Sequence, residues 1–515
     1  MQKRLHFLIA MLMFFTSGVM AQITTSGITG KVTSQGEDVI GATVTAVHQP
    51  SGTLYRAVTN IDGRYTIQGM RVGGPYKVEI TYVGHQPKVF NGVTLNLGET
   101  RNISCSIEED SKELQEIVVT GRAGLNATKT GAATSMNAQQ INDMPSITHG
   151  IADVARLNPQ LTTTSSGVMS FAGTNNRYNQ FLIDGAANND VFGLAGTGTN
   201  GGQAGAQPVS METIEQIQVN IAPFDVRQSG FTGGAINAIT KSGTNQFHGS
   251  LYGYGYNQNL LGHHYKLADG SGYAPRYQKE KDYNFGVTFG GPIVKNKLFF
   301  FVNYEKNNKS YPNLYAFGSD YSDVGKAEAE SIYTKIVEMA KKQGVTYPGV
   351  FTTEDIYTKS EKAGVKLDWN INEFNKASVR WSLVTAKRLN NAGSKSALND
   401  NLYSYPFENN TNTFVAELQS RLSPVVSNEF RANYVRVRDK RAVGAPFPSV
   451  MINNVGKGSV NLGNERSSMA NSLDQDVYTI EDNLTWYKGN HTFTFGTHNA
   501  VSYTHLRAHE TREDL

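Results

Sequence analysis

From Phe247 onward, the sequence consists of aromatic-rich segments of roughly ten residues whose hydrophobicity alternates from one residue to the next. Val365, Leu367 and Trp369 would project from one face of such a strand, and Lys366 and Asp368 from the other. This pattern is typical of a transmembrane β-barrel, in which one face meets lipid and the other a polar interior. A water-soluble β-sandwich alternates in a similar way, so the pattern alone leaves both folds open.

The same alternation recurs further along the chain. It places the following groups on opposite faces of their strands: Ile371 opposite Asn370; Ala377, Val379, Trp381 and Leu383 opposite Ser378, Arg380 and Ser382; and Phe414, Ala416 and Leu418 opposite Val415, Glu417 and Gln419.

The composition favours many short strands and turns, because 51 Gly stand beside only 15 Pro, with 25 Tyr and 24 Phe. A collagen, a coiled coil and a polytopic helical membrane protein are excluded. A net charge of +3 in 515 residues provides no electrostatic surface for wrapping nucleic acid. The single Cys105 excludes a disulfide framework and a cysteine-ligated metal centre.

The first 21 residues have the features of a secretory signal peptide. Lys3 and Arg4 precede the apolar run Phe7–Phe15, and a small-residue cleavage pattern ends at Ala21. The alternative, an uncleaved anchor, is disfavoured because the run is too short to span a bilayer. We therefore expect mature protein from Gln22, outside the cytoplasm, and the absence of disulfides favours a bacterial cell envelope.

Residues 22–107 alternate at period two between turn clusters, as expected for a small β-sandwich. The strings Gly41-Ala-Thr-Val44 and Thr59-Asn-Ile-Asp-Gly-Arg-Tyr65 resemble the carboxypeptidase regulatory-like family. Asp62-Gly63 is expected to form a hairpin turn rather than a calcium loop. We expect Cys105 to pack as a small apolar residue.

A charged linker and a short apolar string occupy residues 108–121. The string Glu116, Ile117, Val118, Val119 and Thr120 could be a last sandwich strand or an exposed strand that waits for a partner sheet, and periodicity alone favours the first. Its context reverses that preference, because the string resembles the coupling segment of TonB-dependent receptors. The resemblance implies that these five residues contact TonB.

Residues 122–245 resemble the plug domain of the same receptor family. The strings that carry the resemblance are Val154-Ala-Arg-Leu-Asn-Pro-Gln-Leu161, Gln180-Phe-Leu-Ile-Asp-Gly-Ala186, Met211-Glu-Thr-Ile-Glu-Gln-Ile-Gln-Val219 and Gly233-Gly-Ala-Ile-Asn-Ala-Ile-Thr240. A compact α/β body with Gly-rich connections can lie inside a wide barrel. The loop Gly193–Gly202 lacks the features of a phosphate-binding motif and is expected to be a plug loop.

Residues 246–500 are expected to form the first part of the barrel. The strings Thr240-Lys-Ser-Gly-Thr-Asn245 and Phe285-Gly-Val-Thr-Phe-Gly-Gly-Pro-Ile-Val294 resemble the Oar-like branch of TonB-dependent receptors, typical of Bacteroidota. The expected fold is therefore mainly β: a sandwich, an α/β plug, and part of a transmembrane barrel of about 22 strands when complete. We expect a hairpin turn at Gly290–Lys297, with Pro292 ending one strand.

Three further segments carry separate expectations. Lys326–Gln343 has Ile332, Ile336 and Met339 at helical spacing, which predicts a loop helix or, as the alternative, a membrane-surface helix. Val501–Leu515 matches one reading frame of a common transposon-based sequencing adapter, and we expect the natural chain to continue differently after Ala500. His263 and His264 are expected to be loop surface rather than metal ligands.

The resemblance implies an outer-membrane transporter, with its N-terminal domain in the periplasm, that takes up a substrate through plug rearrangement driven by the inner-membrane proton gradient. Its implied partners are TonB with its inner-membrane energising complex, outer-membrane lipid, an unidentified substrate and a surface lipoprotein, but no nucleic acid. The alternative is an adhesion or surface-assembly protein of the same fold. We expect no catalytic residues, cofactor or metal, since the sequence contains no arrangement that indicates an enzyme. It does not identify the substrate-binding residues.

Overall fold

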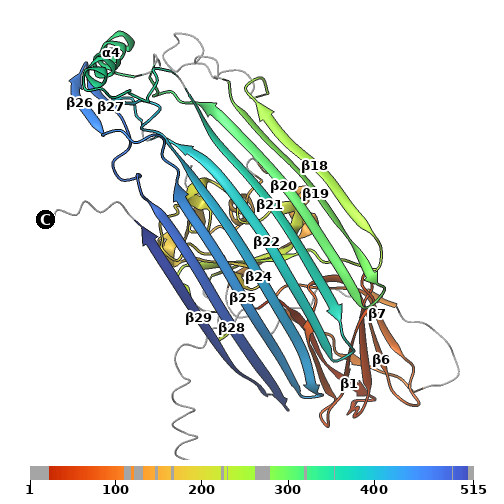
Figure 1. Cartoon of the computed structure of the whole chain (residues 1–515). Helices are drawn as coiled ribbons and strands as arrows, with labels where there is room; N and C mark the ends of the chain where they lie inside the picture. The colour runs from red at the N-terminus through yellow and green to blue at the C-terminus, as the bar shows by residue number, and fades with distance from the viewer. Residues whose placement is uncertain are drawn as a thin grey trace, which may run out of the picture.

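The computed structural model (Figure 1) contains a sandwich, a plug and a broad sheet of long strands. The residues that it describes are 23–109, 118–120, 132–144, 146, 149–163, 168–221, 225–228, 230–260, 279–317, 322–352, 354–391, 393–489 and 491–507. The expected signal peptide, His263 and His264 lie outside these residues.

Two sheets face each other in the sandwich, as the period-two pattern predicts. One has the order β2-β1-β5, with β8 and β9 also paired to β1, and the other has the order β10-β7-β6-β3-β4. The strands are β1 (Ser26–Ser34), β2 (Glu37–Asp38), β3 (Thr43–His48), β4 (Thr53–Val58), β5 (Arg64–Met70), β6 (Gly73–Thr81), β7 (Lys88–Leu95), β8 (Thr100–Asn102), β9 (Cys105–Ser106) and β10 (Val118–Thr120).

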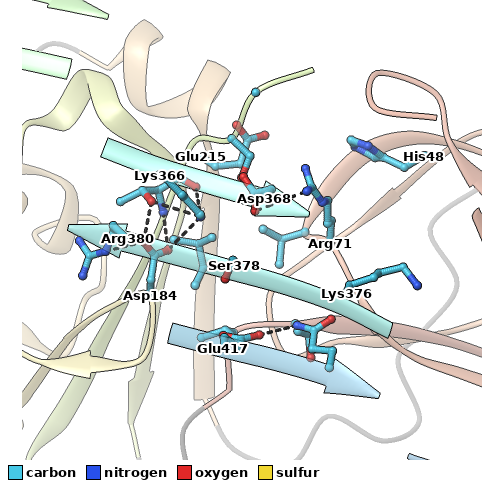
Figure 2. Close-up of a pocket in the computed structure, with 18 of the residues that line it drawn as sticks. His48, Arg71, Asp184, Glu215, Lys366, Asp368, Lys376, Ser378, Arg380 and Glu417 are labelled. Carbon is cyan, nitrogen blue, oxygen red and sulfur yellow. Dashed lines mark hydrogen bonds and ion pairs between the residues drawn. The ribbon is translucent and has the colours of Figure 1, made fainter. Parts of the chain in front are cut away.

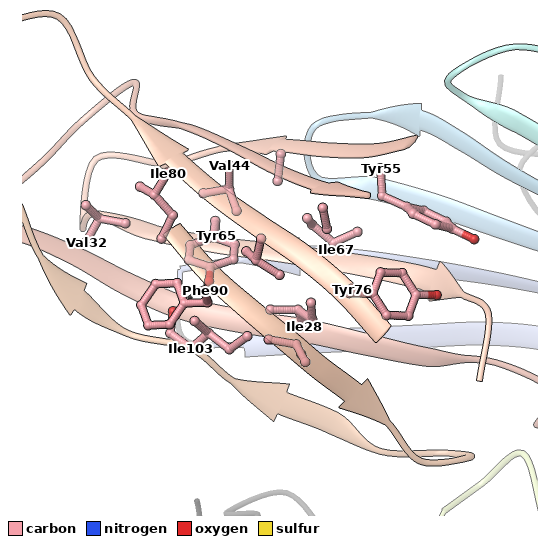
Figure 3. Packing of buried hydrophobic residues seen from close by; sticks show 14 of the residues in the cluster. Ile28, Val32, Val44, Tyr55, Tyr65, Ile67, Tyr76, Ile80, Phe90 and Ile103 are labelled. Atoms are coloured by element: carbon pink, nitrogen blue, oxygen red, sulfur yellow. Dashed lines mark hydrogen bonds between the residues drawn. The ribbon is translucent and has the colours of Figure 1, made fainter. Parts of the chain in front are cut away.

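The core of the sandwich is formed by the inward residues of both sheets, among them Ile28, Val44 and Tyr76 (Figure 3). Cys105 is half-buried against this core, which confirms that it packs as an apolar residue. The Asp62-Gly63 pair forms a tight turn in which Gly63 has a φ of +64°. It is not the predicted hairpin turn, because β4 and β5 on either side of it belong to different sheets. The sandwich is thus a separately packed unit.

The plug is built on one mixed sheet with the order β11-β16-β17-β14-β15, and its apolar core is its own. Asn137 begins its first helix with a reciprocal cap to Gln140. The elements are β11 (Ala132–Asn137), α2 (Ala138–Asp143), α3 (Ile151–Ala155), β12 (Leu161–Thr163), β13 (Met169–Phe171), η1 (Asn176–Tyr178), β14 (Gln180–Ile183), β15 (Ala186–Ala187), η2 (Gly202–Ala204), η3 (Met211–Thr213), β16 (Ile214–Ile221) and β17 (Gly234–Thr240).

Nine antiparallel strands form a tall, curved wall that partly encloses the plug (Figure 1). In spatial order they are β18 (His248–Asn257), β19 (Lys281–Val294), β20 (Leu298–Pro312), β21 (Asp355–Asn370), β22 (Asn375–Asn390), β24 (Tyr405–Ser423), β25 (Val426–Arg441), β28 (Ser472–Lys488) and β29 (His491–Arg507). Among the residues that the structure describes, the wall does not close on itself, because β18 and β29 do not pair with each other.

The two faces of the wall confirm the predicted alternation. Trp369 is 50% exposed on the outer face, whereas its neighbours Asp368 and Asn370 are 5% and 9% exposed. Val379 and Phe414 are likewise outward, and the interior-facing Arg380 is buried. Short turns join the strands at the end next to the sandwich, and long loops join them at the opposite end. We call these the sandwich side and the loop side.

One strand boundary differs from the expectation. Pro292 does not end a strand but lies inside β19, at a β-bulge opposite Phe299. The bulge tolerates the missing backbone N–H of proline. The hairpin turn is consequently shorter than predicted and centres on Asn296, which has a φ of +63°.

The loops on the loop side fold together into a small unit with its own core. It contains α4 (Lys326–Lys342), β23 (Ala397–Asn399), β26 (Val450–Val455) and β27 (Gly458–Leu462), and its sheet has the order β23-β27-β26. The predicted loop helix is confirmed, and its apolar face packs on this core through Ile332 and Ile336. Met339 was wrongly assigned to that face and is exposed, because the buried stripe runs through Ala329 and Ala340 instead.

None of the described helices is long and apolar enough to span a membrane. The wall ends in β29, which continues through Arg507 with Arg507 opposite Ser472. The side chains of residues 501–507 are all exposed. Pairing at a sheet edge uses only backbone groups, so it tolerates almost any sequence there, and the adapter interpretation of residues 501–515 stays a prediction.

Candidate functional site

The predicted coupling segment lies in the sandwich. Val118–Thr120 form β10, which runs parallel to β7 with Val119 opposite Phe90. Glu116 and Ile117 lie outside the described residues. The geometry of a last sandwich strand, which periodicity alone favoured, is therefore the one observed, and TonB contact by these five residues remains a proposal.

An aspartate–glycine turn of the plug points at the wall (Figure 2). Asp184 is buried and has a φ of +47°, and Gly185 follows with a φ of +76°. The Asp184 carboxylate accepts hydrogen bonds from the Thr240 backbone N–H at 2.9 Å and from the Thr240 hydroxyl at 2.5 Å. Neighbouring plug strands thus fix the orientation of the carboxylate.

Two cations of the wall meet this carboxylate. Lys366 Nζ on β21 lies 3.5 Å from Asp184 Oδ1, and Arg380 Nε on β22 lies 3.1 Å from Asp184 Oδ2. Burial alone would raise the pKa of Asp184, but the two cations and the Thr240 hydrogen bonds outweigh it and lower the pKa below its usual value. Asp184 therefore remains ionised and joins the plug to two wall strands.

A third cation packs against the same turn. A Cβ added to Gly185 would lie only 2.7 Å from the guanidinium of Arg431 on β25. This approach is too close for a side-chain atom, so only glycine fits there. Arg431 pairs with Glu417 at 3.1 Å, Glu429 at 2.5 Å and Glu481 at 2.9 Å. Arg431 and Glu481 are completely buried, and three adjacent wall strands hold the cluster.

The N-terminal residues join the cluster to the other domains. The Thr24 hydroxyl lies 2.6 Å from Arg431 Nη2, and the Ile23 carbonyl accepts a hydrogen bond from Asn237 of β17 at 2.5 Å. Ile23 packs with Leu97 of the sandwich and Ile239 of the plug. Sandwich, plug and wall therefore meet at one junction.

A second buried ion pair lies nearer the loop side. Lys362 Nζ on β21 is 2.6 Å from Glu305 on β20, and Glu305 also accepts hydrogen bonds from the hydroxyls of Ser210 in the plug and Tyr252 on β18. Lys362 additionally donates to the backbone carbonyl of Val209 at 3.5 Å. The plug is held at this level by polar contacts as well.

A cavity of about 200 Å³ opens at the junction and is lined by all three parts of the molecule (Figure 2). Arg71 of the sandwich lies 3.4 Å from Asp368 of the wall. Glu215 of the plug also lines the cavity, and burial raises the pKa of its carboxyl despite nearby Lys241 and Lys366. The second carboxylate oxygen of Asp368 is buried without a hydrogen-bond partner among the described atoms.

A larger cavity, of about 780 Å³, lies against the wall toward the loop side, and most of its lining side chains, such as Lys387, Glu408 and Asn410, belong to the outward-facing set of their strands. Ala386 is its only apolar lining residue among the part of the chain that the structure describes. Basic and acidic side chains both line this cavity, as in the ion pairs Lys387–Glu408 at 2.9 Å and Lys306–Glu361 at 2.7 Å. Within the described ranges, no group of three or more His, Cys, Asp or Glu side chains is placed to hold a metal ion.

The sequence indicated some of these residues and missed others. Lys366, Asp368, Arg380 and Glu417 were assigned to the interior face by alternation, but their ion-pair partners were not predicted. Arg431 had no distinguishing signal at all. Its partners come from strands up to 64 residues apart in sequence, from Glu417 to Glu481, and local pattern carries no information on such contacts.

Two family models match the chain. The outer membrane beta barrel domain matches residues 239–319 and 327–511, and the carboxypeptidase regulatory-like domain matches residues 27–108. The TonB-dependent transporter Oar of Myxococcus xanthus is 26% identical over 266 residues, which are 49% of this chain and 24% of Oar. The chain therefore spans about a quarter of that relative.

A solved structure supports the fold. The outer membrane transporter YddB from Escherichia coli has a TM-score of 0.53 and 14% identity to this chain, covering 72% of this chain and 48% of YddB. The expected sandwich and barrel are thereby confirmed, as is an outer-membrane location. This chain belongs to the outer membrane beta barrel domain family, and its sequence is similar to that of a TonB-dependent transporter.

Proposed function

We propose that this chain forms the periplasmic domain, plug and first barrel strands of a transporter that takes up a substrate when TonB pulls on residues 116–120. The observation that carries this proposal is the way the plug is held. Its Asp184-Gly185 turn contacts Lys366, Arg380 and Arg431 on three wall strands. The contacts with Lys366 and Arg380 are ionic. A small apolar cluster also joins Ala204 and Ala206 of the plug to the wall, but the main apolar core of the plug is internal.

A polar contact of this kind suits a plug that must move. Interfaces between domains that move relative to each other are small and polar, because their groups can exchange partners with water. An apolar plug–wall interface would instead expose large hydrophobic area in the lumen whenever the plug rearranged. TonB, energised by the inner-membrane proton gradient, would supply the work of separating Asp184 from its cations.

The substrate, and a surface lipoprotein that would deliver it, remain unidentified. We include both as proposed partners.

The test weakens strand formation in the coupling segment. Val118→Pro or Val119→Pro in the full-length protein removes a backbone N–H, so we expect binding of the periplasmic domain of TonB to weaken at least tenfold. Val118→Thr is the control, because it keeps a β-branched residue and should bind normally.

The corresponding experiment in cells compares the phenotypes of these variants with the phenotype of a deletion of the gene. Equal outer-membrane amounts must be shown first. If the Pro variants reproduced every phenotype of the unmutated gene, TonB coupling would be dispensable and the adhesion or surface-assembly alternative would replace transport.

A further inference from the structure

The strand β10 covers an edge that the sandwich would otherwise leave open. Its sheet has the order β10-β7-β6-β3-β4, so β7 is the last strand when β10 leaves. Val118, Val119 and Thr120 stand opposite Val89, Phe90 and Asn91 of β7 in parallel register. An uncovered edge strand presents unpaired N–H and C=O groups, which pair readily with any extended segment.

The sandwich that carries this edge is fixed in place. Asn370 of the wall donates to Thr53 at 2.9 Å, and Gln218 of the plug donates to the Leu97 carbonyl at 2.8 Å. Both hydrogen bonds are buried. The edge of β7 therefore has a defined position relative to plug and barrel, and so does a strand paired with it.

Strand addition to TonB needs the backbone groups of the same residues. In the proposed function, residues 116–120 form a strand on the sheet of TonB, and their hydrogen bonds carry the pulling force. While β10 is paired with β7, the backbone groups along one of its edges are already in use. A pairing of only three residues is short enough for a longer partner strand to replace it.

We propose that the β7 edge of the sandwich is an intramolecular docking site that holds residues 118–120 and competes with TonB for them. This proposal rests on the proposed function. The sandwich then sets the resting availability of the coupling segment. If the segment is released about one-tenth of the time, the apparent affinity for TonB falls about tenfold.

A reversible crosslink tests the competition. Val89→Cys with Val118→Cys, in a full-length protein that also carries Cys105→Ser, places two thiols at paired positions of adjacent strands, within disulfide range. We expect the oxidised protein to bind the periplasmic domain of TonB at least tenfold more weakly than the same protein after reduction. The matched control is Thr43→Cys with Val58→Cys, which crosslinks β3 to β4 in the same sheet and should leave binding unchanged.

The outcomes separate the two proposals. If the reduced variant and the unmutated protein both fail to bind TonB, the proposed function is wrong and the docking site has no role. If the reduced variant binds but the oxidised one binds equally well, or if no disulfide forms in folded protein, only the docking proposal is overturned.

A second measurement needs no variant. Amide hydrogen exchange at residues 89–91 of the unmutated protein should be slow at rest and should accelerate when the TonB domain is added, because β10 leaves the edge. Exchange at these amides that is unaffected by bound TonB would contradict the competition. Residues 43–48 of β3, an inner strand, serve as the internal reference.

Discussion

Asp184 holds its position in the lumen by balancing two buried cations. Asp184→Asn keeps the shape of the side chain but leaves Lys366 and Arg380 without a counter-charge, which costs about 3–5 kcal/mol when one partner of a buried pair is removed. We expect a loosened plug, measured as entry of a large antibiotic through the outer membrane and as faster proteolysis of the plug.

The control for that variant is an exposed pair on the same wall. Glu361→Gln breaks the solvent-exposed contact with Lys306 and should leave the stability almost unchanged, because water screens the pair. If Asp184→Asn had as little effect as Glu361→Gln, the plug would not depend on this contact.

Asp400 predicts a pH dependence in the loop unit. Its buried carboxylate accepts from the Tyr347 hydroxyl and from the Tyr403 backbone N–H at 2.8 Å, and the Tyr347 oxygen accepts from the Gly463 N–H at 3.1 Å. Three loops therefore meet at this residue. Burial raises the pKa of Asp400 to about 6, despite these hydrogen bonds.

The sign follows from the raised pKa. Because the folded pKa is the higher one, protonation of Asp400 stabilises the folded loop unit. This stabilisation, about 3 kcal/mol at most, is complete when the pH is below the usual pKa near 3.8, and it is lost as the pH rises through 6. We expect proteolysis of these loops to be slower at pH 5 than at pH 7.5. Asp400→Asn should remove most of that difference, and the rest should follow Glu354, whose pKa burial also raises.

At the scale of single elements, the stability of a wall strand in lipid depends on which residues occupy its outer face. Phe414 is exposed on the outer face at the middle of β24. Phe414→Lys should cost about 2–4 kcal/mol, because a charge near the bilayer midplane is poorly solvated. The measurement is the fraction of full-length protein that inserts into lipid vesicles.

Asn410→Lys is the matched control for this element. Asn410 lies on the same face of β24 as Phe414 but four residues nearer the loop side. There the cost of a charge falls to about 0–1 kcal/mol. Equal insertion of the two Lys variants would contradict the assignment of this face to lipid.

At the scale of the whole molecule, the wall has two open edges, on β18 and β29. In lipid, unpaired backbone groups each cost several kcal/mol, so only a closed barrel is stable there. We expect a polypeptide of residues 22–500 not to insert stably and to show no heat-dependent shift in gel mobility. A shift in mobility after reconstitution would show that these strands close, for example by association of two copies.

Much of this architecture could be predicted from local sequence, because it depends on which face of an element a side chain occupies. Period-two alternation determined the outward Trp369 and the inward Asp368, turn residues determined the tight turn at Asp62-Gly63, and helical spacing determined α4. The tertiary structure alone decided which inward charges meet. Asp184 finds Lys366 and Arg380, and Arg431 finds Gly185, only after plug and wall have packed together. Sequence pattern records the face of a strand, whereas ion pairing depends on distances between segments up to about three hundred residues apart, which no local periodicity encodes.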